Sequence, residues 1–219
     1  MDPPECNGHS HDHHDHENDL GLSLRPQVDL PGVQCFNEEI PNSGRAVIKA
    51  HQDRLTVEPV LRSQPDDPEL LLFIPFTEAV VVQSISIRSV IPGQGHHDDA
   101  SPPRHVKLFV NRDDLDFDTA RDLEPAMQLE LLPPHHFVEG TIDYPLRPAG
   151  RFQNISSLTI LVVDNYSGED ERSTIITFVG LKGKGTNVRR MAVEAVYETQ
   201  PMPKQTTAKA FDAFARESC

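Results

Sequence analysis

The sequence lacks tryptophan and has only three cysteines, which lie far apart at Cys6, Cys35 and Cys219. No CxxC pair occurs, so a dithiol redox centre is excluded, and the odd number of cysteines argues against a disulfide framework. The N-terminus has neither the basic start nor the apolar run of a signal peptide. We therefore expect free thiols in a reducing compartment, with a cytoplasmic location and the nucleus as a further possibility.

Basic residues are scarce, because 20 Lys and Arg stand against 34 Asp and Glu, for a net charge of -14. Nucleic acids and anionic membranes are bound through clustered Lys and Arg, so neither is expected as a partner. Long apolar runs are also missing. The longest, around 70–76 and 158–163, are far shorter than the roughly 20 residues that span a bilayer.

Residues 1–20 contain six carboxylates, no Lys or Arg, and five of the eleven histidines. A segment of this composition cannot bury itself, so we predict a disordered tail over 1–20. An alternative is metal binding, because imidazole and thiolate are ligands for zinc, copper and nickel. The spacing defines no tetrahedral site, and we assign no metal ligand or cofactor. The side chains concerned are Cys6, His9, His11, His13, His14 and His16.

The body of the chain alternates apolar and polar residues in short stretches, with proline and glycine between them. No 12-residue amphipathic helix interrupts the series, so crossover helices for a parallel sheet are missing. The pattern predicts an all-β fold, an antiparallel β-sandwich or jelly roll. Ahead of it, 24–37 is expected to be an extended segment packed against the sandwich. The predicted strands are 69–76, 80–90, 105–111, 127–132, 137–144, 156–164, 174–181 and 190–197.

No catalytic motif is present, whether a nucleophile elbow, a Walker loop, an HExxH pair or a dinucleotide fingerprint. The glycine-rich run 180–185 lacks the Ser or Thr of a phosphate loop, and we interpret it as a hairpin turn. The run 114–118 is similar to the start of a calcium loop, but Thr119 and Pro125 stand where such a loop needs glycine and glutamate. We expect Leu115, Phe117 and Leu123 to pin this loop to the sandwich instead. His96-His97 and His135-His136 are interpreted as exposed pairs. We predict no enzyme and no catalytic residue.

Six blocks follow one another along the chain at 34–38, 69–76, 105–111, 116–118, 152–155 and 179–183. In this order and spacing they resemble the PITH domain family, the C-terminal module of thioredoxin-like proteins that associate with the proteasome. One departure is Phe36, where the family pattern would have leucine; it retains an apolar side chain. The resemblance covers about 24–198 and implies a jelly roll similar to galactose-binding-like domains.

The resemblance also implies a non-catalytic protein-interaction module. In the thioredoxin fusion the partner is the proteasome regulatory particle, and the hypothesis for this chain is that it keeps the same contact. The His-rich start and the lack of a preceding thioredoxin domain are similar to stand-alone members of the family, without disulfide reductase activity. We expect a monomer with a PITH domain over 21–200. The C-terminal tail over 201–219 is expected to be disordered or a short helix, with Phe211 and Phe214 as candidate partner anchors. Small-ligand binding, as of a carbohydrate, at the jelly-roll rim is the alternative from fold analogy.

Overall fold

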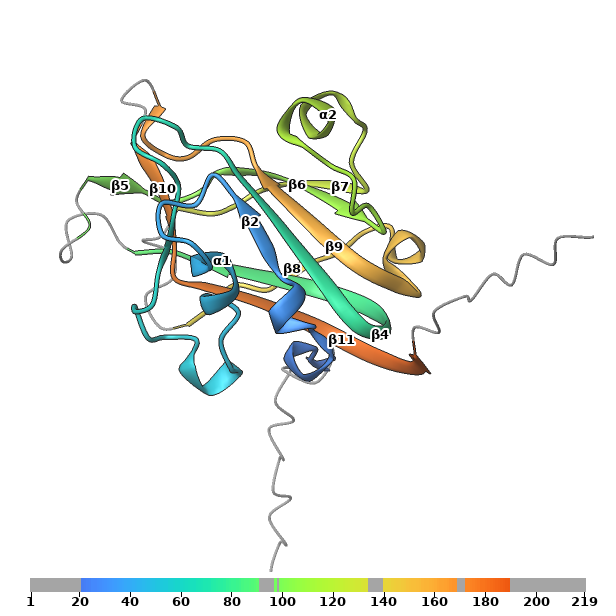
Figure 1. The fold of residues 1–219 in the computed structure, drawn as a ribbon. Coiled ribbons are helices and arrows are strands. Elements are labelled where there is room, and N and C mark those ends of the chain that lie inside the picture. The colour runs from blue at the N-terminus through green and yellow to red at the C-terminus, as the bar shows by residue number, and fades with distance from the viewer. Residues whose placement is uncertain (1–20, 91–96, 98, 134–139, 169–171, 190–219) are drawn as a thin grey trace, which may run out of the picture.

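The structure is a computed structural model that describes residues 21–90, 97, 99–133, 140–168 and 172–189. Within these ranges the strands form an eight-stranded sheet and a three-stranded sheet (Figure 1). The strands are β1 (Leu22–Ser23), β2 (Gln34–Phe36), β3 (Leu61–Arg62), β4 (Leu70–Arg88), β5 (Ala100–Ser101), β6 (His105–Val110), β7 (Met127–Glu130), β8 (Tyr144–Pro145), β9 (Ile155–Val162), β10 (Ser173–Ile176) and β11 (Phe178–Arg189).

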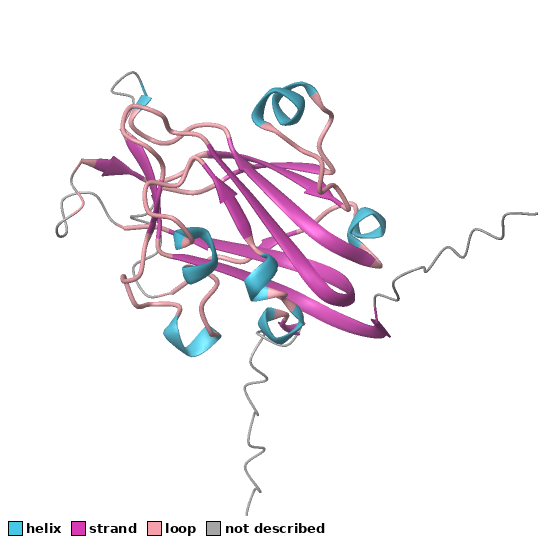
Figure 2. Cartoon of the chain, in the orientation of Figure 1, coloured by secondary structure: helices cyan, strands magenta, loops and turns pink. Residues whose placement is uncertain are grey.

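Helices are short in the described part of the chain, and none has the length and apolarity needed to cross a membrane. They lie in the loops around the strand layers (Figure 2). The α-helices are α1 (Ser43–Ala46) and α2 (Phe117–Asp122). The 3-10 turns are η2 (Arg25–Gln27), η3 (Leu30–Gly32), η4 (His51–Asp53) and η6 (Ala149–Phe152).

The long strand β4 belongs to both layers of the fold. Its first part, Leu70 to Pro75, pairs with β9 on one side and with β2 on the other. The chain then bends, and the part from Val80 to Arg88 pairs with β11, while Ser84 and Ile85 also pair with β8. Figure 2 shows this strand turning back on itself. The bend places one half of β4 over the other, which creates a two-layered sandwich.

The main core fills the space between the two halves of β4. Leu72 and Ile74 from the first half and Ile85 and Ile87 from the second belong to one buried cluster. Their alternation follows from the strand period of two, which sends every second side chain inward. The pairs of the eight-stranded sheet are all antiparallel, and only β5 and β10 pair in parallel. The expected all-β antiparallel sandwich is confirmed.

Several predicted boundaries are wrong. The intervals 69–76 and 80–90 form the single strand β4, with a register shift between Pro75 and Val80. The interval 174–181 is instead divided at Thr177 between β10 and β11. The segment 24–37 does pack on the sandwich, with Leu24 and Val33 buried, but it contains the turns η2 and η3 instead of running fully extended.

The glycine-rich run 180–185 is not a hairpin turn, because β11 continues through it. A Cβ atom at Gly183 would lie 1.9 Å from the carbonyl oxygen of Val81, where the register of β11 against β4 shifts. Glycine is therefore needed there for a close approach of two backbones at a bulge.

Other predictions fall partly or wholly outside the described residues. Of the predicted strand 137–144, residues 140–143 are not in a strand, β8 begins at Tyr144, and 137–139 are not described. The predicted strand 190–197, the tails 1–20 and 201–219, and with them Phe211 and Phe214, also lie outside the described part.

Candidate functional site

The loop that carries α2 covers one half of the outer face of the sheet. Leu115 and Ala120 of this loop pack on outward-facing Leu71, Phe109 and Leu161 in a second, smaller core cluster. Phe117 and Leu123 are partly buried against the same cluster. The expectation that Leu115, Phe117 and Leu123 pin the loop is confirmed, although part of the loop is helical.

The helix α2 begins at a side-chain cap. The Asp116 carboxylate accepts a hydrogen bond of 2.8 Å from the backbone N–H of Thr119. Hydrogen bonds from Thr119 hold the pKa of Asp116 below its usual value. Arg121, at the other end of the helix, binds the Glu69 carboxylate ahead of β4. These contacts fix the loop and the apolar side chains beneath it.

Beside the α2 loop, the outer face of the sheet stays open as a groove of about 410 Å³. One wall is the segment 29–36, with Asp29 and Phe36, and the other wall is 112–115, with Arg112 and Asp113. The floor consists of β4 from Leu71 to Pro75 and of Thr159 in β9. Figure 1 shows β2, β4 and β9 side by side in this region. We call this feature the Phe36 groove.

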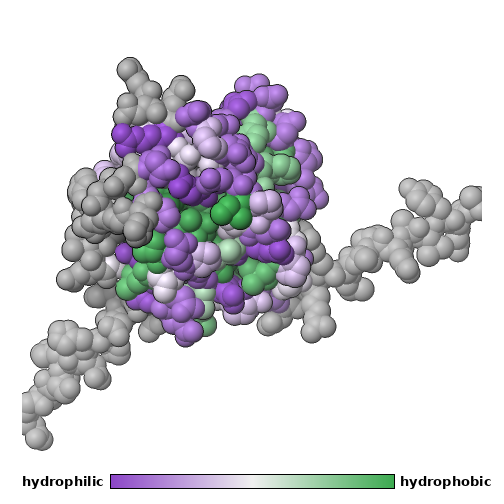
Figure 3. Space-filling view, turned by 60° about the vertical axis from the view of Figure 1, so that its left-hand side comes forward, coloured by the Kyte–Doolittle hydropathy of each residue, from purple (hydrophilic) through white to green (hydrophobic). Residues whose placement is uncertain are grey.

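Phe36 is the most exposed apolar residue of the groove, and 49% of it is exposed. It is the only aromatic member of the large exposed apolar residues in the described ranges. In the register of β2, Phe36 lies opposite Leu71 and Gln34 lies opposite Phe73, so their side chains share the outer face. Figure 3 shows apolar residues gathered in patches on one face of the molecule, bordered by hydrophilic ones.

Cys35 lies between these two residues, and its side chain packs against the main core instead. A Cβ atom at Gly44 would lie 2.5 Å from the Cβ of Cys35, so α1 approaches the thiol closely. Burial, with a smaller contribution from the nearby Glu38 carboxylate, raises the pKa of the Cys35 thiol. Cys35 is a free thiol, whereas the expected free thiols of Cys6 and Cys219 lie outside the described residues.

The rim of the Phe36 groove is negatively charged. Arg112 makes two hydrogen bonds to the Asp114 carboxylate, of 2.7 and 2.9 Å. The hydrogen bond to Asp114 raises the pKa of Arg112. Asp29 and Asp113 make no ion pair with any described residue. The one cation of the rim is therefore neutralised, while two carboxylates remain available.

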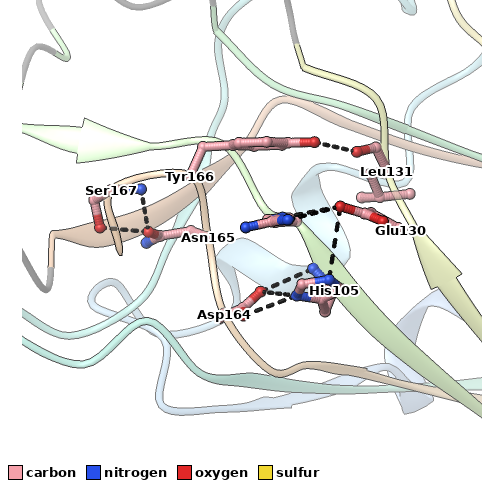
Figure 4. A network of polar contacts seen from close by, with 8 residues as sticks. His105, Glu130, Leu131, Asp164, Asn165, Tyr166 and Ser167 are labelled. Carbon is pink, nitrogen blue, oxygen red and sulfur yellow. Dashed lines mark hydrogen bonds and ion pairs between the residues drawn. The ribbon is translucent and has the colours of Figure 1, made fainter. Parts of the chain in front are cut away.

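A second polar cluster lies where β6, β7 and β9 meet at one end of the sheet (Figure 4). His105 begins β6, and its Nδ1 lies 2.8 Å from both carboxylate oxygens of Asp164, just after β9. The Nε2 of His105 lies 3.8 Å from Glu130, at the end of β7. Arg104 donates to the same Glu130 oxygen from Nε at 3.1 Å and from Nη2 at 2.9 Å. We call this cluster the His105 network.

Two tyrosines border the His105 network. The Arg104 guanidinium lies 5.6 Å from the centre of the Tyr166 ring, and the Tyr166 hydroxyl donates to the Leu131 carbonyl at 2.5 Å. The hydroxyl of Tyr144 accepts a hydrogen bond of 2.8 Å from the Leu132 N–H. Burial raises the pKa of both tyrosines. The network thus combines an aromatic ring with planar charged groups at the sheet end.

Among the described residues, no group of three or more His, Cys, Asp and Glu side chains could hold a metal ion. Of the histidine pairs, only His97 is described, and it lies 3.3 Å from Glu58. The His tract of the N-terminus lies outside the described ranges.

Sequence reasoning assigned no site residues and missed the Phe36 groove. The available signal was Phe36 itself, a large apolar residue at a position where the family pattern has leucine. Asp29 and Asp113 gave no signal, because isolated carboxylates are common on any surface. Their significance arises only from their places on facing walls.

The two layers of antiparallel strands, with the long strand β4 shared between them, define a galactose-binding-like jelly-roll domain. Solved structures agree with this class. The CBM32-1 and CBM32-2 domains of Clostridium perfringens ZmpB match 73% of this chain and 36% of that chain, with a TM-score of 0.50 and 10% identity. CpGH89 from the same organism, in complex with GlcNAc-alpha-1,4-galactose, matches 80% of this chain and 16% of that one, with a TM-score of 0.50 and 11% identity. These similarities concern the fold alone.

The family follows from sequence comparison. A sequence model of the PITH domain matches residues 14–201, and the chain belongs to the PITH domain family. PITH domain-containing protein 1 of Dictyostelium discoideum is 30% identical over 213 residues, which cover 97% of this chain and 98% of that protein. PITH domain-containing protein 1 of Homo sapiens is 32% identical over 184 residues, which cover 84% and 79%.

Proposed function

We propose that the chain is a non-catalytic protein-interaction module that binds its partner through the Phe36 groove. The observation that carries this proposal is the half-exposed Phe36 beside an apolar floor, on a rigid sheet face that the α2 loop leaves open. Exposed aromatic side chains beside apolar pockets are typical anchors of protein interfaces. From the family resemblance, we propose that the partner is the proteasome regulatory particle. The chain would bind it as a monomer, in the cytoplasm or the nucleus.

The binding free energy expected from burying Phe36 is of the size typical of an interface anchor. A phenylalanine buries about 200 Å² when fully enclosed, so covering the exposed half of Phe36 contributes about 2–3 kcal/mol at about 25 cal/mol per Å². A loss of this size weakens binding by at least about thirtyfold. The anchor is therefore measurable by one substitution.

The test is affinity purification of the tagged full chain from cell lysate, with regulatory-particle subunits quantified by mass spectrometry. The Phe36→Ala variant is expected to recover far less of the particle than the natural chain. Leu55→Ala is the control, because Leu55 is 47% exposed and does not line the groove. Recovery of no regulatory-particle subunit by the natural chain would overturn the partner. Equal recovery by Phe36→Ala would overturn the groove as the binding surface.

A second candidate function is the binding of a saccharide at the His105 network. Saccharide sites combine an aromatic face with planar polar groups, and Tyr166 lies there with Arg104, His105 and Glu130. A glycan array probed with the natural chain and with Tyr166→Ala tests this candidate. Binding above background that Tyr166→Ala abolishes is the expected result, and a signal that is absent or unaffected contradicts it.

A further inference from the structure

The Phe36 groove is elongated along β4. Its floor follows β4 from Leu71 to Pro75, a distance of about 13 Å at about 3.3 Å per strand residue. The two walls, 29–36 and 112–115, stand on opposite sides of this floor. The hydroxyl of Thr159 donates to the Arg112 carbonyl at 2.9 Å, which ties the floor to one wall. A trough of these dimensions accepts an extended segment of about five residues.

Apolar side chains line the middle of the trough, while polar groups contribute the larger share of its exposed lining overall. Phe36 forms one side, and Phe73, Leu71 and Pro75 contribute to the floor. Phe73 is half-buried, whereas Leu71 and Pro75 are buried. In an extended chain, side chains at positions i, i+2 and i+4 point to the same face. One apolar side chain at the central position would therefore enter the trough together with the side chains two residues before and after it.

Each wall carries one carboxylate without an ion pair among the described residues, Asp29 on one side and Asp113 on the other. Arg112 offsets them only in part, because its guanidinium makes its hydrogen bonds to Asp114 and has a smaller charge attraction to Asp113. Like charges in contact across an interface are unfavourable, and opposite charges select the partner and its register. Because the two carboxylates lie on opposite walls, the rim favours Lys or Arg side chains that extend from a segment on the floor towards either wall, and it rejects carboxylates.

We propose that the Phe36 groove takes an extended segment of a partner protein in which an apolar residue has Lys or Arg two residues before and two residues after it. This inference rests on the proposed function and names the partner segment by its chemistry. A second copy of the chain is disfavoured as the occupant, because each copy has a net charge of -14.

Short peptides test the proposal directly on the full chain, by fluorescence anisotropy at low ionic strength. The probe is a labelled Lys-Thr-Leu-Thr-Lys peptide with blocked ends. The matched peptides are Glu-Thr-Leu-Thr-Glu, which reverses the charge, and Lys-Thr-Ser-Thr-Lys, which removes the apolar residue. We expect saturable binding of the first peptide and at least tenfold weaker binding of the other two.

Variants of the rim provide the second arm. The double variant Asp29→Asn/Asp113→Asn keeps the side-chain shape and is expected to weaken binding of the lysine peptide about tenfold. Asp122→Asn removes one carboxylate charge from α2 outside the groove and is expected to leave binding unchanged. Equal binding of the lysine and glutamate peptides, or no effect of the double variant, overturns the proposal.

The segment 204–216 meets the proposed chemistry only in part, because Lys209 lies two residues before Phe211 and Arg216 lies two residues after Phe214. If the lysine peptide binds only after Phe211→Ser/Phe214→Ser, the groove is filled by the chain itself, and the proposal of a partner segment is overturned. The proposed function fails separately. If recovery of the regulatory particle depends on Phe36 but peptide binding does not depend on charge, this inference is overturned. The proposed function is then still supported.

Discussion

Glu38 holds the turn that follows β2 and thereby one wall of the Phe36 groove. Its carboxylate accepts hydrogen bonds from the backbone N–H groups of Asn42 and Gly44 and from the Ser43 hydroxyl. Gly44 is buried, so removal of the carboxylate leaves a backbone donor without its partner. Hydrogen bonds to a charged group contribute more than neutral ones.

We predict that Glu38→Ala lowers the free energy of unfolding by about 2 kcal/mol, measured by urea denaturation. Glu39→Ala is the control, because Glu39 is exposed and pairs with Arg62 over 3.4 Å. A surface ion pair of this kind contributes below about 1 kcal/mol. Equal losses in the two variants would contradict the role given to Glu38.

Cys35 is predicted to be an unreactive thiol in the folded protein. The thiolate is the reactive form, and a raised pKa keeps the neutral thiol dominant at any pH below the folded-state value. Alkylation of Cys35 by iodoacetamide at pH 8, mapped by mass spectrometry, should be at least tenfold slower than in urea-unfolded chain. Rapid labelling of Cys35 in the folded state would show that α1 does not cover it.

At the scale of elements, the bulge between β11 and β4 depends on glycine. Gly183→Ala places a methyl group against the Val81 carbonyl oxygen, so the two strands must separate. We predict a loss of about 2–4 kcal/mol in the free energy of unfolding. Gly150→Ala is the matched control, since a Cβ atom there meets nothing within 4 Å. Differential scanning calorimetry of both variants measures the difference in stability. Similar melting temperatures would contradict the need for glycine at the bulge.

The same bulge explains where sequence reasoning succeeded and where it failed. The strands β6 and β9 were predicted to within two residues, because apolar side chains recur at every second position along each of them. The run 180–185 of β11 was wrongly predicted to be a turn, because a glycine-rich sequence is equally typical of a turn and of a close contact between two strands. Only the position of Val81 on the neighbouring strand distinguishes them.

The Phe36 groove could not be predicted for a related reason. An alternating pattern in 34–36 says which residues share a face but not whether that face points to solvent. Phe36 faces outward because β2 pairs with β4 in the register that places it beside Leu71, and this pairing spans 35 positions of the chain. The α2 loop, which covers the adjoining half of the face, joins it from still farther away.

For the whole molecule, deletions can measure whether residues 1–20 contribute to the stability of the folded domain. Removal of residues 1–20 takes away six of the fourteen net negative charges, and we predict a melting temperature within about 2 °C of the full chain. Removal of residues 1–28 also deletes Leu24 and Val28, which are 1% and 6% exposed, and should lower the melting temperature by more than about 10 °C. A large effect of the shorter deletion would place part of 1–20 within the folded body.

The bend in β4 has a consequence for how the protein folds. Because β4 belongs to both layers, neither layer can open without disturbing the other, and we expect a single cooperative unfolding transition. Ile85 of β4 pairs with Leu181 of β11, almost half the chain away, and such distant pairing makes folding slow. During synthesis, the second half of β4 cannot pair with β11 until β11 has left the ribosome. Until then its Val, Ile and Ser residues form an unpaired strand edge, the kind of surface that chaperones shield.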